Sequence, residues 1–228
     1  MRHSQQPYRV THRLQLAPNI VSYTLTPCGT PLSIQPGQYV LWHTQNQAIH
    51  CSVADETAAG VLQFHLRENA SHDLLSITLN DVCFLEGPFG HCVIQTPIQS
   101  PLLFVAGGTG YAPYNRLIPH VLNQQLSSDI HFYWGVQRKE DWYAWNTLHD
   151  LTHSSAHFHF IPVLANAEAS WHGRTGLVHE VVLEDFLSLA EATVFASGPW
   201  PMIQTLSNHF CAKGLAPQRL FSDFLPPD

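Results

Sequence analysis

Hydrophobic and polar positions alternate with a period of two in the first part of the chain. The stretch Val61 to Arg67 places Leu62, Phe64 and Leu66 on one side, with Val61 and three polar residues on the other. This alternation is typical of a half-buried strand. Many short strands separated by turn residues predict an antiparallel barrel or sandwich. The expected strands are Tyr8–Leu16, Ile20–Thr26, Gly37–His43, Ile49–Ala54, Val61–Arg67, and a hairpin of Val82–Leu85 with His91–Ile94 around Glu86–Gly90.

One helix is expected among these strands. Ser71 is a good N-cap, and Asp73 places a negative charge in the first turn, where the helix dipole favours it. Further along, the stretch Thr96 to Pro101 has two prolines and few residues that could pack. A domain boundary is therefore predicted between residues 97 and 98.

After this boundary, strand and helix patterns alternate. Alternation of this kind predicts a parallel sheet wound on both faces, with ligands at the carboxyl ends of its strands. The expected strands are Leu102–Ala106, Ile130–Gly135, His157–Leu164, Thr193–Ala196 and Arg219–Ser222, and the expected helices are Tyr111–Leu126, Glu140–Leu151, Val178–Leu189 and Pro199–Lys213.

The first of these strands leads into a glycine-rich turn. Gly107, Gly108 and Gly110 separate the apolar run from the following helix. Strand, glycine turn and helix together can present backbone N–H groups and a helix N-terminus to a pyrophosphate. The glycines allow close approach because a Cβ would block it. The spacing G-G-x-G-x-A is shorter than the full dinucleotide fingerprint, so a tight turn without a ligand is an equal alternative from this motif alone.

Composition narrows the class of protein. Among 228 residues, 45% are hydrophobic, so a core can form and disorder is not expected. Only 10 residues are Lys or Arg and the formal net charge is −7, which argues against a nucleic-acid surface. The first residues lack the apolar core of a signal peptide, and no apolar stretch approaches the roughly 18 residues that span a bilayer. Five scattered cysteines favour free thiols in a reducing compartment. A soluble, cytoplasmic protein is expected.

The 16 histidines suggest no metal site from sequence alone. His157 and His159 would share one face of a strand, as two metal ligands can. No third ligand is evident nearby in the sequence, and surface or core histidines are the preferred interpretation.

Several motifs together resemble a known family. The chain resembles the ferredoxin–NADP reductase superfamily and, within it, the short NAD(P)H:flavin reductases. The resemblance implies a flavin-binding-type β-barrel over residues 1–97 and an NAD(P)-binding α/β domain over residues 98–228. The motifs are Pro36–Val40, Glu86–Gly90, Val105–Pro113, Phe132–Tyr143, His172–Gly176, Ala196–Met202 and Arg219–Leu225, in the order of the family.

The resemblance implies a nicotinamide site in the second domain. It places Thr109 near the nicotinamide ring, with Ser197 facing it from a neighbouring strand end. Arg138 and Lys139 would lie near the adenosine ribose, where they could favour a 2′-phosphate or simply be solvated, so NADH and NADPH remain alternatives. The residues implied for this cofactor are Gly107, Gly108, Thr109, Gly110, Arg138, Lys139, Ser197, Gly198 and Pro199.

The flavin site departs from the family. Relatives carry R-x-[YF]-[ST], where this chain has Ile49 to Ser52, and only Ser52 matches. Isoleucine cannot supply the forked donors of a guanidinium, and Cys51 cannot supply a ring face. A flavin could still bind loosely, as a substrate, to backbone groups of His50, Cys51, Ser52 and Val53. The resemblance suggests further contacts from Arg67, Ser71 and Phe224, each of which has an ordinary surface, capping or packing role as its alternative.

These expectations define an oxidoreductase that moves a hydride from NAD(P)H to a free or loosely bound flavin (FAD, FMN or riboflavin). Such chemistry asks mainly for orientation of two rings, with Ser52, Thr109 and Ser197 as the polar groups beside them. An acceptor protein for the electrons is a further expectation. The alternatives are a nucleotide-binding or interaction module that has lost flavin binding, and a general α/β binding domain.

Overall fold

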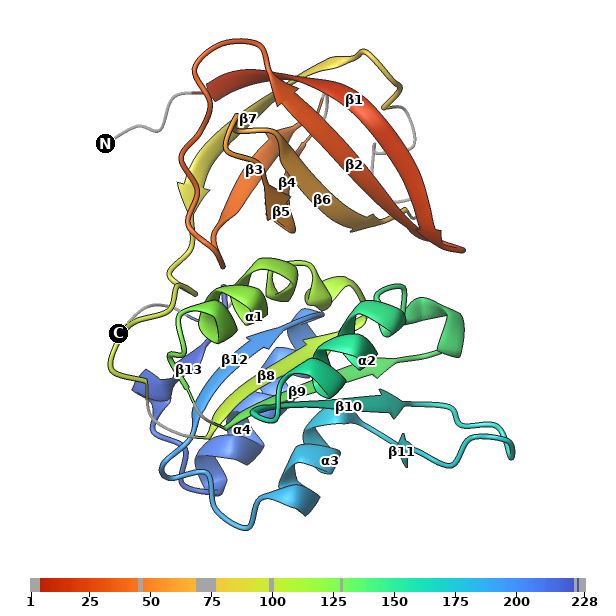
Figure 1. Ribbon diagram of the computed structural model, residues 1–228, viewed down its shortest axis with the longest axis vertical. Helices are drawn as coiled ribbons and strands as arrows, with labels where there is room; N and C mark the ends of the chain where they lie inside the picture. The colour runs from red at the N-terminus through yellow and green to blue at the C-terminus, as the bar shows by residue number, and fades with distance from the viewer. Residues whose placement is uncertain are drawn as a thin grey trace. The chain divides into compact units, whose positions relative to one another are not determined.

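The computed structural model describes residues 5–44, 47–68, 77–98, 101–127, 129–223 and 225. These fall into two compact units: Met1–Val93 with Ala112–Ile118, and Ile94–Tyr111 with Pro119–Asp228. The first unit holds an antiparallel sheet and the second a parallel sheet with helices (Figure 1). The predicted fold class is confirmed.

The first unit is a seven-stranded sheet in the order β4-β3-β7-β1-β2-β6-β5. Every neighbouring pair is antiparallel. Alternate side chains of these strands form an apolar core around Tyr23, Trp42 and Phe64, all fully buried. The strands are β1 (Gln5–Ala17), β2 (Ile20–Pro27), β3 (Tyr39–His43), β4 (Ala48–Ser52), β5 (Asp55–Glu56), β6 (Leu62–Arg67) and β7 (Val82–Phe89).

The predicted hairpin around Glu86–Gly90 is wrong. Strand β7 runs through this stretch, and Glu86 pairs with Gln5 of β1 on one side and Leu41 of β3 on the other. Residues 91–95 that follow are not a strand. Pairing on both edges of β7 outweighs the local turn preference of Gly-Pro, since strand formation depends strongly on its neighbours. The helix predicted from Ser71 falls on residues 69–76, which lie outside the described residues.

The second unit is a six-stranded parallel sheet in the order β11-β10-β9-β8-β12-β13. Helices α3 and α4 cover one face and α2 lies on the other (Figure 1). The strands are β8 (Leu102–Gly107), β9 (Ile130–Val136), β10 (Phe158–Leu164), β11 (Arg174–Thr175), β12 (Thr193–Ser197) and β13 (Leu220–Phe221). The helices are α1 (Tyr114–Asn123), α2 (Trp145–Ser154), α3 (Val178–Asp185) and α4 (Trp200–Ala212), with 3₁₀ turns η2 (Gly108–Tyr111), η3 (Lys139–Asp141) and η4 (Pro217–Arg219).

The helix predicted over Glu140–Leu151 is divided in the structure. A 3₁₀ turn ends at Asp141, and α2 begins only at Trp145. The backbone leaves the helical region at Trp142, which has φ −80° and ψ 65°. The buried indole of Trp142 donates a hydrogen bond to the Trp134 carbonyl at 3.1 Å, and this contact fixes the break. Among the described residues, no helix is long and apolar enough to cross a membrane.

Candidate functional site

The glycine turn of the second unit is closed by its neighbouring strand. Ala106 of β8 pairs with Ser197 of β12, so the two carboxyl strand ends lie side by side. A Cβ on Gly110 would overlap the Ser197 carbonyl oxygen and would lie 2.9 Å from the Gly198 nitrogen. Only glycine fits at position 110 without moving backbone, because real Cβ atoms do not approach other backbone atoms this closely.

Two further glycines of the site, Gly107 and Gly198, lie against each other and against the Met202 side chain. A Cβ on Gly107 would lie 2.6 Å from the Met202 sulfur, and one on Gly198 would lie 3.1 Å from the Gly107 nitrogen. The structure therefore brings together Gly107, Gly110 and the stretch Ser197–Pro199, as the sequence suggested. Backbone polar groups gathered at a glycine-lined strand end suit a pyrophosphate.

Aromatic rings that the sequence analysis did not single out support this turn. The Trp134 indole donates to the Gly108 carbonyl at 2.8 Å. Tyr111 stacks on Trp134 with centroids 4.5 Å apart, and Tyr143 meets Trp134 edge-on at 5.3 Å. Burial raises the pKa of Tyr111 above its ordinary value, so its hydroxyl stays neutral. The sequence does contain a signal for these supporting rings. Aromatic residues occupy alternate positions of β9, and alternate residues of a strand share one face.

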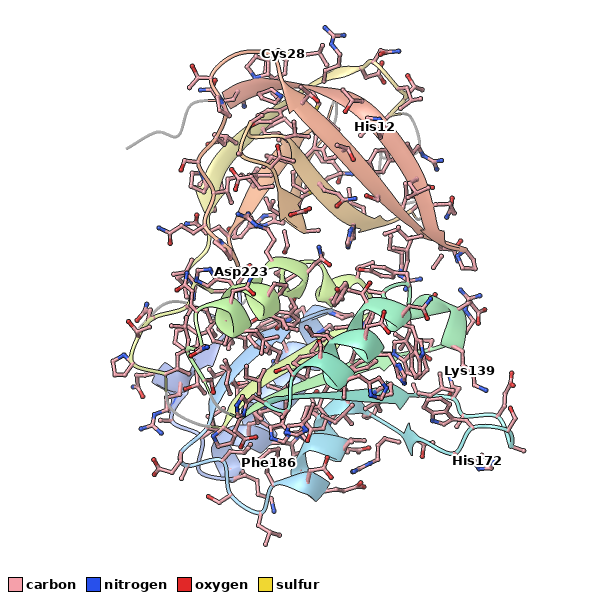
Figure 2. All side chains as sticks on the ribbon, viewed as in Figure 1. His12, Cys28, Lys139, His172, Phe186 and Asp223 are labelled. Carbon is pink, nitrogen blue, oxygen red and sulfur yellow. The ribbon has the colours of Figure 1, made fainter. Side chains whose placement is uncertain are left out.

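Arg138 and Lys139 follow β9 at the carboxyl edge of the sheet, and both are already engaged. The Arg138 guanidinium lies 3.5 Å from Glu140 and 3.5 Å from the buried Asp141. Lys139 donates to the Ser170 hydroxyl at 3.3 Å and lies over the Trp171 ring at 5.6 Å. Figure 2 shows Lys139 on the side of the second unit that also carries the loop with His172.

The segment Ile49–Val53 of the first unit, which the sequence suggested as a flavin contact, has an exposed and a buried side. Cys51 is fully buried in the core, and burial raises the pKa of its thiol. Ser52 is half-buried and pairs with Tyr39 of β3. The exposed His50 ring stacks on Tyr39 at 5.1 Å, and Tyr39 also contacts Phe89 at 5.7 Å. Tyr39, His50 and Phe89 form an aromatic surface beside Ser52, which we call the aromatic platform.

The remaining expected site residues are placed as follows. The Val53 N–H donates to the Gln38 carbonyl at 3.3 Å, so this backbone donor is used within the unit. Arg67 ends β6 and is partly exposed. Thr109 lies within the 3₁₀ turn η2. Ser71 and Phe224 lie outside the described residues.

Known proteins are similar to this chain in sequence. The family model of the oxidoreductase NAD-binding domain matches residues 104–208, which include the glycine turn and β12. A "Probable flavin reductase" of Photobacterium leiognathi is 31% identical over 178 residues, 74% of this chain and 76% of that protein. A protein of Yersinia pestis named CDP-6-deoxy-L-threo-D-glycero-4-hexulose-3-dehydrase reductase is 29% identical over 214 residues, 91% of this chain and 64% of that protein.

A solved structure shows the same fold. The cytochrome P450 reductase of Amycolatopsis superposes with a TM-score of 0.85 at 22% identity, covering 97% of this chain and 70% of that chain. The chain spans about two thirds of the length of the first curated relatives, 67% and 64%. The chain belongs to the flavin reductase family, and is thereby an oxidoreductase of the nicotinamide- and flavin-dependent class.

Proposed function

We propose that this chain transfers a hydride from NAD(P)H to a flavin that binds and leaves as a substrate. The observation that carries the proposal is the glycine-lined strand end of Gly107, Gly110 and Ser197–Pro199, in a chain of the flavin reductase family. A hydride carries two electrons from the nicotinamide to the flavin, and solvent supplies the proton that completes flavin reduction. A non-catalytic nucleotide-binding module is not favoured.

In this proposal the second domain, residues 98–228, holds the nicotinamide cofactor. The missing Cβ atoms of Gly107 and Gly110 let Met202 and the Ser197 carbonyl pack against this turn, so the turn and the end of β12 lie together. The backbone groups of Gly107, Gly108 and Gly110 are the candidate contacts for the pyrophosphate. Thr109 and Ser197 are the polar groups beside the nicotinamide. Gly198 and Pro199 extend the same strand end, and Arg138 with Lys139 lies toward the ribose.

The first domain, residues 1–97, receives the flavin. The aromatic platform offers ring faces, which Cys51 cannot offer because it has no ring and is also buried. Ser52, the backbone of His50 and the carbonyl of Val53, whose N–H is bonded to Gln38, are the candidate polar contacts. Arg67 is a candidate for the flavin side chain. Isoleucine at position 49 removes a guanidinium from this strand, which favours a flavin that exchanges rather than one held permanently.

The electrons have a further destination in this proposal. A relative is named as the reductase of a dehydrase, which supports an acceptor protein for the present chain as well. The described residues contain no disulfide, which supports a reducing compartment such as the cytoplasm as the place of action.

Steady-state oxidation of NADH and NADPH tests the proposal. The purified protein is mixed with each nicotinamide and with riboflavin, FMN or FAD, and nicotinamide absorbance is followed. We expect oxidation that saturates with the added flavin. Oxidation no faster than the protein-free background, with every pair, would overturn the proposal.

A further inference from the structure

A cluster of metal-ligating side chains lies at the opposite end of the parallel sheet from the glycine turn. Asp129 immediately precedes β9, His131 is the second residue of β9, and His159 is the second residue of β10. The register pairs His159 with His131 across the two parallel strands. Gly107 pairs with Gly135 at the other end of β9, so this cluster is at the amino edge of the sheet.

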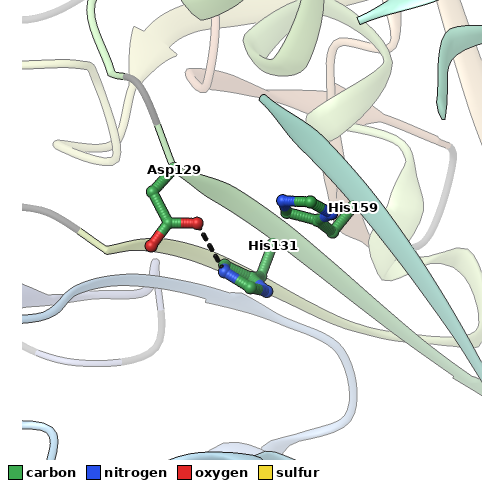
Figure 3. Close-up of side chains that lie close together, drawn as sticks. All are labelled: Asp129, His131 and His159. Atoms are coloured by element: carbon green, nitrogen blue, oxygen red, sulfur yellow. Dashed lines mark hydrogen bonds and ion pairs between the residues drawn. The ribbon is translucent and has the colours of Figure 1, made fainter. Parts of the chain in front are cut away.

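The three side chains converge (Figure 3). A carboxylate oxygen of Asp129 lies 2.7 Å from Nε2 of His131. The His131 and His159 rings are 4.9 Å apart and inclined by 34°. One ligand atom from each residue can be chosen so that all lie within 4.8 Å of one another. Ligands about 2.0–2.2 Å from one ion are somewhat closer together than this. The His159 side chain is exposed, so its ring can rotate toward the other two ligands.

The backbone of both histidines and the ring of His131 are held in place by the surrounding structure. Both histidine backbones are fixed by the sheet, and the side chain of His131 is only 21% exposed. Phe186 meets the His131 ring edge-on at 5.2 Å, and Tyr133 stacks on it at 6.4 Å. Tyr133 is anchored in turn by its hydrogen bond to Asp185 at 2.8 Å. Ligands oriented by their surroundings bind metal more tightly than free ones.

We propose that Asp129, His131 and His159 bind a divalent transition-metal ion of the zinc class. Two imidazole nitrogens and a carboxylate oxygen are a common zinc ligand set, with water in the fourth position. Calcium and magnesium are disfavoured because they prefer oxygen ligands alone. The ion links β9 to β10 at the sheet edge remote from the proposed hydride transfer, so its role is to stabilise the second unit.

The ligand set could not be found along one strand. His157 and His159 share a strand face in the sequence, and no third ligand is evident near them there. The ligands that join His159 come instead from β9 and from the residue just before it, twenty-eight and thirty residues earlier in the numbering (159 − 131 and 159 − 129). Strand pairing, which the sequence alone does not give, brings them together.

Zinc chloride titration of the full chain, stripped with a chelator, tests the site by calorimetry and by thermal unfolding. We expect zinc to bind and to raise the unfolding midpoint. His159→Asn and Asp129→Asn are expected to weaken this binding by more than about tenfold, since even changes to supporting residues cost that much. Both variants should unfold at the wild-type midpoint in chelator, because the changed side chains are partly or fully exposed.

Two matched controls separate this site from other histidines. His157→Asn alters an exposed histidine at the start of the same strand region, and His153→Asn alters the His149–His153 pair, whose rings are 4.5 Å apart on α2. Both variants should keep wild-type zinc affinity and midpoint shift. The proposal is overturned if the wild type shows no zinc-dependent shift, or if His159→Asn binds zinc as the wild type does. It is also overturned if His153→Asn or His157→Asn abolishes binding.

Discussion

At the scale of single residues, Gly110 is where the candidate nicotinamide site is most sensitive. A Cβ there overlaps the Ser197 carbonyl, which is backbone and cannot rotate away. We expect Gly110→Ala to cost about 1–3 kcal/mol of stability through this overlap and to raise the KM for NAD(P)H. Denaturant unfolding and steady-state kinetics measure the two effects. At Gly29 a Cβ meets no atom of the described residues within 4 Å, so Gly29→Ala should change neither quantity. Equal kinetics for both variants would contradict the assignment.

Positions 49 and 51 carry a second residue-scale prediction. Ile49→Arg restores a guanidinium on β4 and should tighten FMN and FAD more than riboflavin, because only the first two carry phosphate. Cys51→Tyr should instead destabilise the fold, since the fully buried Cys51 leaves no room for a ring. Flavin fluorescence quenching gives the affinities, and denaturant unfolding gives the stability. If Ile49→Arg tightens all three flavins equally, or none, the arginine does not reach a phosphate here.

At the scale of elements, the division of one predicted helix into η3 and α2 depends on Trp142. Its indole N–H bonds to the Trp134 carbonyl in a buried place. Trp142→Phe removes this buried hydrogen bond and should cost about 1 kcal/mol in the free energy of unfolding. Trp171→Phe removes a similar bond, to the Arg174 carbonyl at 2.9 Å, where partial exposure lets water replace it. Its cost should be clearly smaller; a larger one would show that the rings, not the hydrogen bond, hold this region.

Two strands show why prediction from the sequence succeeded only in part. Buried runs such as Leu102–Ala106 predicted strand β8 correctly, because a short apolar run between glycines has few other uses. Glu86–Gly90 predicted a turn and was wrong, because Gly and Pro signal locally while β1 and β3 act across the sheet. Periodicity reports which residues share a face and leaves out which strands are neighbours. For that reason the aromatic support of the glycine turn and the Asp129–His131–His159 cluster emerged only from the structure.

At the scale of the whole molecule, the order of the motifs along the chain predicts the class of protein better than any single motif does. The glycine turn alone left a tight turn without ligand as an equal alternative. The order of domain types and the later strand-end motifs favoured an oxidoreductase, and the flavin reductase relative supports that class over 74% of the chain. The flavin strand was the exception, since Ile49 and Cys51 depart from the family. Its aromatic platform depends on Tyr39 of the neighbouring strand, which no pattern within Ile49–Ser52 could reveal.

The stability of the molecule should fall in mild acid because of a buried histidine. Burial lowers the pKa of His65 from 6.5 to about 4 in the folded chain. Between about pH 4 and pH 6.5, His65 therefore binds a proton in the unfolded chain but not in the folded chain. The corresponding part of the free energy of unfolding is fully present above pH 6.5 and is lost as pH falls from 6.5 through about 4. The total loss is on the order of 3 kcal/mol. Burial also lowers the pKa of His179 in the second unit, and that shift acts in the same direction.

His65→Leu removes the titrating group, so its denaturation midpoint should fall less over this pH range than the wild-type midpoint does. The comparison is of slopes with pH, which separates the proton effect from any loss of packing at neutral pH. His12→Leu changes an exposed histidine of the same unit and should keep the wild-type slope. Parallel curves for His65→Leu and the wild type would mean that His65 is protonated in the folded state and that water reaches its ring.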